Sequence, residues 1–150
     1  MGAVIAGAAV GSWRDDVVFN CGDSRVYRMY TERWTGVGKL TKVSHDHSVV
    51  QHLFDEGRLT EDQMRTDWRR GTLTAAIGTD QIFAPTHLWS RPIRLRSDDA
   101  LLICSDGVWE ALTREQMEEA FYTEEPERKL LELLRGVCCD DNVSFIVLRN

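Results

Sequence analysis

Residues 100–107, Ala-Leu-Leu-Ile-Cys-Ser-Asp-Gly, decide the fold, because they predict a buried strand that delivers Asp106 at its end. Residues 143–148, Val-Ser-Phe-Ile-Val-Leu, predict a second strand that begins just after Asp141. If the two strands are antiparallel neighbours, the end of one lies beside the start of the other. Both carboxylates then project from one edge of a sheet. Carboxylate oxygens that converge from rigid elements are the ligands that a hard divalent cation needs.

Further strands are predicted along most of the chain. Apolar or alternating runs occur at residues 3–10, 17–20, 26–30, 37–43, 73–77 and 93–96. The first three are separated by short polar segments, which is the spacing of an antiparallel meander with tight turns.

Helices are predicted between some of these strands. Residues 48–56 carry one apolar stripe, Thr60-Glu61 caps a second short helix, and residues 127–138 have the same periodicity. Thr113, with Gln116 three residues later, predicts a capping box for a helix through Phe121. The fold class is therefore α+β, with helices packed on antiparallel sheets.

The composition excludes several classes of protein. A chain of 150 residues with 43% hydrophobic content is one domain that can build its own core. The formal net charge of −6 and the lack of a long Lys/Arg stripe argue against a nucleic-acid partner. No apolar run is long enough to span a bilayer, so we expect no membrane partner. The four cysteines have neither zinc spacing nor a disulfide framework, which favours reduced thiols and a cytoplasmic location.

Two further carboxylates stand at comparable places in the chain. Asp23 lies between two predicted strands, so we expect it at a hairpin tip, although Asp is also an ordinary turn residue. Glu110 can reach back toward Asp106 if a helix starts there, and its alternative role is favourable electrostatics in a first helical turn. Taken singly, Asp106 and Asp141 are also explained as turn or capping residues. Their expected meeting at one sheet edge is what favours a metal site.

Other reactive side chains have simpler interpretations. His45 and His47 lack a third transition-metal ligand nearby in the sequence, so surface or packing roles are favoured. Cys21 and Cys104 lie inside apolar runs and are expected to be inert buried thiols. Trp109 is expected to be a packing anchor beneath the metal edge.

Five motifs occur in an order that covers nearly the whole chain. They are Asn20-Cys21-Gly22-Asp23-Ser24-Arg25-Val26-Tyr27, Leu40-Thr41 with Asp46-His47-Ser48, Leu73-Thr74 with Ala76-Ile77-Gly78, Asp99 to Glu110, and Asp141-Asn142-Val143-Ser144. Together they resemble the metal-dependent Ser/Thr protein phosphatase family of the protein phosphatase 2C type (PPM), and in particular its bacterial members.

This resemblance implies a sandwich of two antiparallel β-sheets flanked by helices, in α-β-β-α layers, with Mg²⁺ or Mn²⁺ at one edge. In the family, a metal-bridging water attacks the phosphorus of phosphoserine or phosphothreonine in a protein substrate, without a covalent intermediate. Asp106 and Asp141 match ligands of the two core ions. Asp23 and Glu110 match positions that help to hold a weaker third ion in several members.

The chain also departs from the family pattern. The family's Asp-Gly-x-Gly-Gly segment, its metal-bridging carboxylate and its phosphate-contacting arginine have no counterpart here. Residues 1–150 are therefore expected to form one N-terminally incomplete phosphatase domain. Two alternatives stay open. One is a phosphatase-like binding or regulatory module whose exposed sheet edge takes a partner chain or a second copy, and the other is an inactive fragment.

Overall fold

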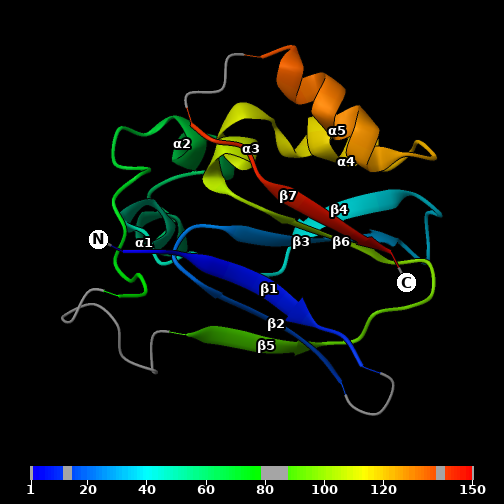
Figure 1. Cartoon of the computed structure of the whole chain (residues 1–150), viewed down its shortest axis with the longest axis horizontal. Helices are drawn as coiled ribbons and strands as arrows, with labels where there is room; N and C mark the ends of the chain where they lie inside the picture. Colours follow the sequence, from blue (N-terminus) through cyan, green and yellow to red (C-terminus); the bar gives the residue numbers. More distant parts are fainter. Residues whose placement is uncertain (1, 12–14, 79–87, 138–140, 150) are drawn as a thin grey trace.

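Two antiparallel sheets form the centre of the computed structural model, which describes residues 2–11, 15–78, 88–137 and 141–149 (Figure 1). The strands are β1 (Ile5–Ala9), β2 (Asp16–Cys21), β3 (Arg25–Thr31), β4 (Gly38–Lys42), β5 (Trp89–Ile93), β6 (Ala100–Cys104) and β7 (Phe145–Arg149). One sheet has the order β1-β2-β5 and the other β4-β3-β6-β7. The predicted α+β class with two antiparallel sheets is confirmed.

Short helices complete the fold. They are α1 (Val49–Asp55), α2 (Glu61–Thr66), α3 (Asp106–Ala111), α4 (Arg114–Ala120) and α5 (Pro126–Arg135). Of these, α1, α2 and α4 have side-chain N-terminal caps. Thr60 and Thr113 each form a capping box with the glutamine three residues later, as expected for Thr113. These caps satisfy backbone N–H groups that a helix of six or seven residues would otherwise leave exposed to water.

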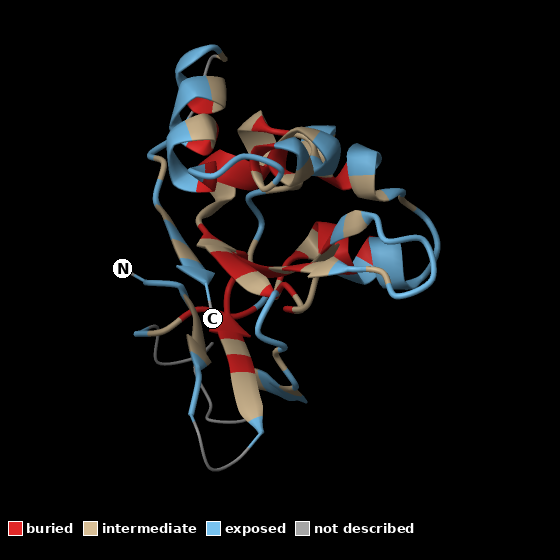
Figure 2. Cartoon of the chain, turned by 90° about the vertical axis from the view of Figure 1, so that its right-hand side faces the viewer, coloured by how far each residue is buried: buried red, intermediate tan, exposed pale blue. Residues whose placement is uncertain are grey.

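The core lies in two layers, one on each face of the four-stranded sheet. Tyr27, Leu102 and Cys104 pack against Trp109, Leu130 and other apolar side chains of α3, α4 and α5. On the opposite face, Val26 and Leu101 meet Val18 of β2 between the two sheets. Figure 2 shows the buried residues concentrated in these layers.

Helices cover one outer face of the sandwich. In Figure 1, α3, α4 and α5 lie above the four-stranded sheet, whereas α1 and α2 lie near one end of the strands. Across residues 2–11, 15–78, 88–137 and 141–149, no helix lies over the outer face of the β1-β2-β5 sheet, so three of the four expected layers are seen. Every helix in these same ranges is too short or too polar to cross a membrane.

The predicted meander is wrong between β2 and β3. These strands belong to different sheets, so Asp23 lies on a crossover between sheets and not at a hairpin tip. Val18 and Val26 face each other across the sandwich, and an alternating pattern cannot reveal which sheet a strand joins. Residues 73–77 form only isolated bridges, Ser48 with Leu73 and Ala3 with Ile77. The strand predicted at residues 93–96 lies earlier in the chain, where the structure has β5 at Trp89–Ile93.

The crossover depends on Gly22, which yields a stability test. A Cβ added at Gly22 would lie 2.2 Å from Val4 Cγ1, at a φ of +108°. Gly36 has a φ of +68° but no atom within 4 Å of an added Cβ, so Gly36→Ala is a control for the backbone effect alone. We expect Gly22→Ala to lower the free energy of unfolding by about 2–4 kcal/mol and Gly36→Ala by about 1 kcal/mol, measured in urea. Equal losses would contradict the close packing at the crossover.

Candidate metal centre

Three strand ends meet at one edge of the four-stranded sheet. Arg25 of β3 pairs with Cys104 of β6, and Cys104 pairs with Phe145 of β7 on its other side. The start of β3, the end of β6 and the start of β7 are therefore neighbours. Asp23 precedes β3, Asp106 follows β6, and Asp141 precedes β7, so the register brings their three backbone positions to the same edge. The predicted antiparallel pairing behind Asp106 and Asp141 is confirmed.

The segments that carry Asp106 and Asp141 are joined directly. The Ser105 backbone N–H donates to the Ser144 carbonyl at 2.9 Å, and the Ser144 N–H donates to Ser105 Oγ at 3.1 Å. A Cβ added at Gly107 would lie 2.5 Å from the Asn142 carbonyl oxygen and 3.3 Å from that of Asp141. Only a glycine after Asp106 permits this close approach.

The carboxyl group of Asp23 lies in an unfavourable electrostatic environment. Asp23 is 6% exposed, and its carbonyl accepts a hydrogen bond from Trp109 Nε1 at 3.0 Å. Burial, followed by the negative charge of Asp106, raises the pKa of Asp23 to about 6. Asp23 and Asp106 therefore repel each other, and a cation between them would remove that repulsion.

The turn that carries Asp23 is held by the segment before α1. The His47 backbone N–H donates to the Gly22 carbonyl at 2.7 Å, and the Gly22 N–H donates to His47 Nδ1 at 3.3 Å. Asn20 Nδ2 donates to the His45 carbonyl at 2.8 Å, while His45 Nε2 pairs with Asp55 Oδ2 at 2.8 Å. Both histidines therefore have structural roles, as expected.

A buried ion pair lies directly beneath this edge. Arg25 Nε donates to Asp46 Oδ2 at 2.8 Å, and the guanidinium carbon lies 3.5 Å from the centroid of the Trp109 ring. Lys42 Nζ lies 3.4 Å from Asp46 Oδ1, and burial lowers the pKa of Lys42 to about 8. This network was not predicted from the sequence, although a charged residue such as Arg25 inside an apolar strand was an available signal. Trp109 has the anchoring position expected for it.

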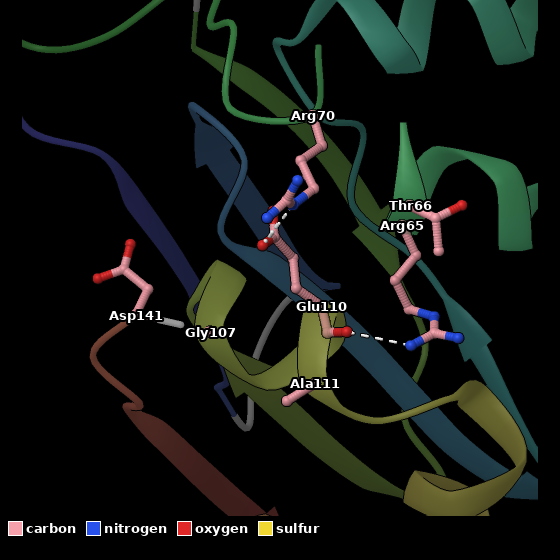
Figure 3. A pocket seen from close by; sticks show the side chains of 7 residues that line it. All are labelled: Arg65, Thr66, Arg70, Gly107, Glu110, Ala111 and Asp141. Atoms are coloured by element: carbon pink, nitrogen blue, oxygen red, sulfur yellow. Dashed lines mark hydrogen bonds and ion pairs between the residues drawn. The ribbon is translucent and has the colours of Figure 1, made fainter. Parts of the chain in front are cut away.

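Glu110 faces a cavity beside the edge but already has a cationic partner. Helix α3 begins at Asp106, which is the condition under which Glu110 can reach back toward Asp106. A cavity of about 290 Å³ is lined by Arg65, Thr66, Arg70, Gly107, Glu110, Ala111 and Asp141 (Figure 3). Glu110 Oε2 accepts a hydrogen bond from Arg70 Nε at 2.8 Å. A cation bound by Glu110 would therefore compete with Arg70.

The cysteines at this end of the sheets are not poised as nucleophiles. Cys21 and Cys104 are buried free thiols. Burial raises the pKa of Cys104 to about 12 and also raises that of Cys21. Because the thiolate is the reactive form, both are inert near neutral pH, as expected.

Comparison with known proteins identifies the family. No family model matches the chain. The Ser/Thr protein phosphatase PstP of Mycobacterium tuberculosis is 32% identical over 129 residues, which cover 84% of this chain and 23% of PstP. The structure of the PPM Ser-Thr phosphatase MsPP from Mycobacterium smegmatis, in complex with cacodylate, matches 99% of this chain and 62% of its own at 27% identity, with a TM-score of 0.82. The catalytic domain of PstP in complex with two manganese ions gives a TM-score of 0.74 at 28% identity over 97% of this chain and 57% of that one.

The chain belongs to the bacterial PPM-type phosphatase family. It spans less than two thirds of each of these relatives, 23% in the case of full-length PstP. The phosphatase activity of these longer relatives is therefore a proposal for this chain.

In this PPM-type chain, the four predicted ligands share one region but do not form a closed metal shell. Asp141 is exposed, Asp106 is half-buried at the start of α3, Asp23 is buried beside it, and Glu110 is turned toward Arg70. Among the residues that the structure describes, no group of three or more His, Cys, Asp or Glu side chains is arranged to hold a metal ion. Metal binding by the four residues stays a prediction.

The raised pKa of Asp23 makes stability depend on pH. The Asp23 carboxyl group has a pKa of about 6 in the folded protein and 3.8 in the unfolded chain. As the pH rises between these values, the unfolded chain loses the carboxyl proton more readily than the folded protein does. Ionisation of Asp23 therefore destabilises the metal-free fold progressively over this range. We expect the free energy of unfolding of Asp23→Asn, relative to that of the wild type, to increase by about 2–3 kcal/mol from pH 4 to pH 7 in EDTA, measured by urea unfolding. A stability difference that does not change with pH would show that the Asp23 carboxyl group is not in this environment.

Proposed function

We propose that this chain carries the metal-binding edge of a Ser/Thr protein phosphatase, which hydrolyses phosphoserine or phosphothreonine in proteins with Mg²⁺ or Mn²⁺. The observation that carries this proposal is the meeting of three strand ends, each next to an aspartate, in a member of the PPM-type family. The proposed metal ligands are Asp23, Asp106, Asp141 and Glu110. The proposed partner is a phosphoprotein substrate.

The donor chemistry fits a hard divalent cation. All four proposed ligands are carboxylates, which suit Mg²⁺ and Mn²⁺ better than softer metals. The repulsion between Asp23 and Asp106 favours a positive charge at the same place. The PstP catalytic domain, a solved relative, is in complex with two manganese ions. In the family there are two core ions and, in several members, a weaker third one.

The chain's own residues would supply positioning. A divalent cation, when bound, supplies an activated water and offsets the charge of the phosphoryl group. The hydrogen bonds between Ser105 and Ser144 keep the Asp106 and Asp141 segments adjacent. Trp109, in the same helix as Asp106, holds the backbone of Asp23. The exposed Asp141 leaves this side of the edge open to a protein substrate.

Two further parts of the proposal concern context. We infer that residues 1–150 correspond to one incomplete phosphatase domain, since they match 62% of the MsPP chain. We also infer a cytoplasmic location, because Cys21 and Cys104 are free thiols, which persist in reducing compartments. Thiol titration of protein isolated under non-reducing conditions tests the second inference, and recovery of these thiols as disulfides would contradict it.

The metal proposal is tested by titrating the chain with Mn²⁺ in a calorimeter and by assaying hydrolysis of a phosphoserine peptide. We expect Asp106→Asn and Asp141→Asn each to weaken Mn²⁺ binding at least about tenfold, because each removes a charged ligand oxygen. Any hydrolysis should disappear in EDTA. Glu132→Gln, at an exposed position on α5, is the matched control and should bind Mn²⁺ as the wild type does.

Hydrolysis that survives EDTA would contradict the metal mechanism. Unchanged Mn²⁺ affinity in Asp106→Asn and Asp141→Asn would contradict the ligand assignment. Metal binding without hydrolysis would favour the second candidate function.

The second candidate is a phosphatase-like module that binds a partner chain or a second copy without catalysis. Two exposed apolar residues on β7 favour it. Ile146 pairs with Ile103 and Leu148 with Leu101, so all four lie on the inner face of the four-stranded sheet. However, Ile146 is 62% and Leu148 37% exposed, whereas Leu101 is fully buried. The inner face therefore extends beyond the sheet that covers it, and added polypeptide could bury the remainder.

Sedimentation velocity tests this second candidate. We expect concentration-dependent association of the isolated chain, which Ile146→Glu should abolish because it places a charge on the apolar face. Leu131→Glu, at an exposed apolar position on α5, is the control and should associate normally. A wild-type chain that stays monomeric at all concentrations would contradict self-association.

A further inference from the structure

The cavity beside the metal edge contains a second arginine, Arg65, with an unusual set of partners. Arg65 lies on α2, and its Nη1 donates to the backbone carbonyl of Glu110 at 3.1 Å. Its Nε is buried and has no hydrogen-bond partner. Within residues 2–11, 15–78, 88–137 and 141–149, no carboxylate forms an ion pair with Arg65.

Three other arginines near Arg65 each form an ion pair with a carboxylate. Arg70 pairs with Glu110 at 2.8 Å, Arg69 with Asp67 at 2.8 Å, and Arg114 with Glu61 at 3.0 Å. A guanidinium group binds carboxylates and phosphates through several parallel N–H donors, and a single backbone carbonyl uses only part of this capacity. Arg65 is thus a half-buried cation that lines a cavity and retains unused donors.

The position of Arg65 indicates which anionic group of a substrate it binds. Figure 3 shows Arg65 and Asp141 on opposite sides of the cavity, with Glu110 between them. A phosphoryl group bound at the metal edge would lie on the Asp141 side. A group that reaches Arg65 would therefore belong to another part of the same substrate.

We propose that Arg65 is a specificity-determining residue that binds the carboxylate of an Asp or Glu next to the phosphoresidue of a protein substrate. The cavity between α2 and α3 holds this flanking side chain. This proposal rests on the proposed phosphatase function and adds to it a preference for acidic phosphorylation sites.

The test measures binding of three fluorescent peptides by anisotropy, with the full chain in Mn²⁺. The first carries a non-hydrolysable phosphonate analogue of phosphoserine flanked by glutamates, the second carries the analogue flanked by glutamines, and the third carries serine flanked by glutamates. We expect the first peptide to bind about tenfold more tightly than the second, a typical gain from one charge-assisted pair. Arg65→Gln should remove this difference and leave affinity for the second peptide unchanged.

Matched variants keep the test decisive. Arg69→Gln removes a nearby arginine that does not line the cavity and should keep the preference. Arg65→Glu should reverse the preference toward a peptide flanked by lysines, a gain that misfolding cannot produce. The proposal is overturned if Arg65→Gln keeps the wild-type preference, or if the wild type does not distinguish the first two peptides. Equal binding of the first and third peptides would instead contradict the phosphatase function, whatever Arg65 does.

Discussion

The buried guanidinium of Arg25 is the interaction on which the rest of the site depends. It pairs with Asp46 and lies against the Trp109 ring, so it connects β3, the segment before α1 and α3. Trp109 in turn donates to the Asp23 carbonyl. Loss of one partner of a buried ion pair typically costs about 3–5 kcal/mol, because the other charge is left without compensation. The same contact thus holds the fold together and holds two candidate metal ligands in place.

The site above this ion pair is shaped by competition among charges. Asp23 and Asp106 repel each other, and the exposed Asp141, in the segment before β7, lies at the same edge. Glu110 extends the acidic region, but Arg70 binds its carboxylate. A cation at this edge would relieve the first conflict and would compete with Arg70 for Glu110. The arrangement therefore favours cations close to Asp23 and Asp106 more strongly than cations at Glu110.

Much of this arrangement was predictable from particular residues. The apolar run 100–104 and the run after Asp141 each predicted a strand, because apolar runs and the flanking acids are local features. Their antiparallel pairing was a hypothesis, which the register of β6 and β7 confirms. The sheet change at Gly22 was not predictable, because Val18 and Val26 have the same alternation in either topology. The pairs Arg25–Asp46, Glu110–Arg70 and Arg65–Glu110 were also inaccessible, since the two residues of each pair lie at least 21 positions apart along the chain. Motif order identified the family, and only the tertiary contacts revealed how its acidic residues are balanced.

Binding of divalent cations is proposed for the edge formed by Asp23, Asp106 and Asp141. The most direct measurement is anomalous X-ray diffraction from crystals of the chain soaked in Mn²⁺, collected near the manganese absorption edge. We expect an anomalous peak between the carboxylates of Asp23, Asp106 and Asp141, at a ligand distance of about 2.0–2.3 Å. Anomalous peaks found only elsewhere on the molecule, or none at saturating Mn²⁺, would contradict it.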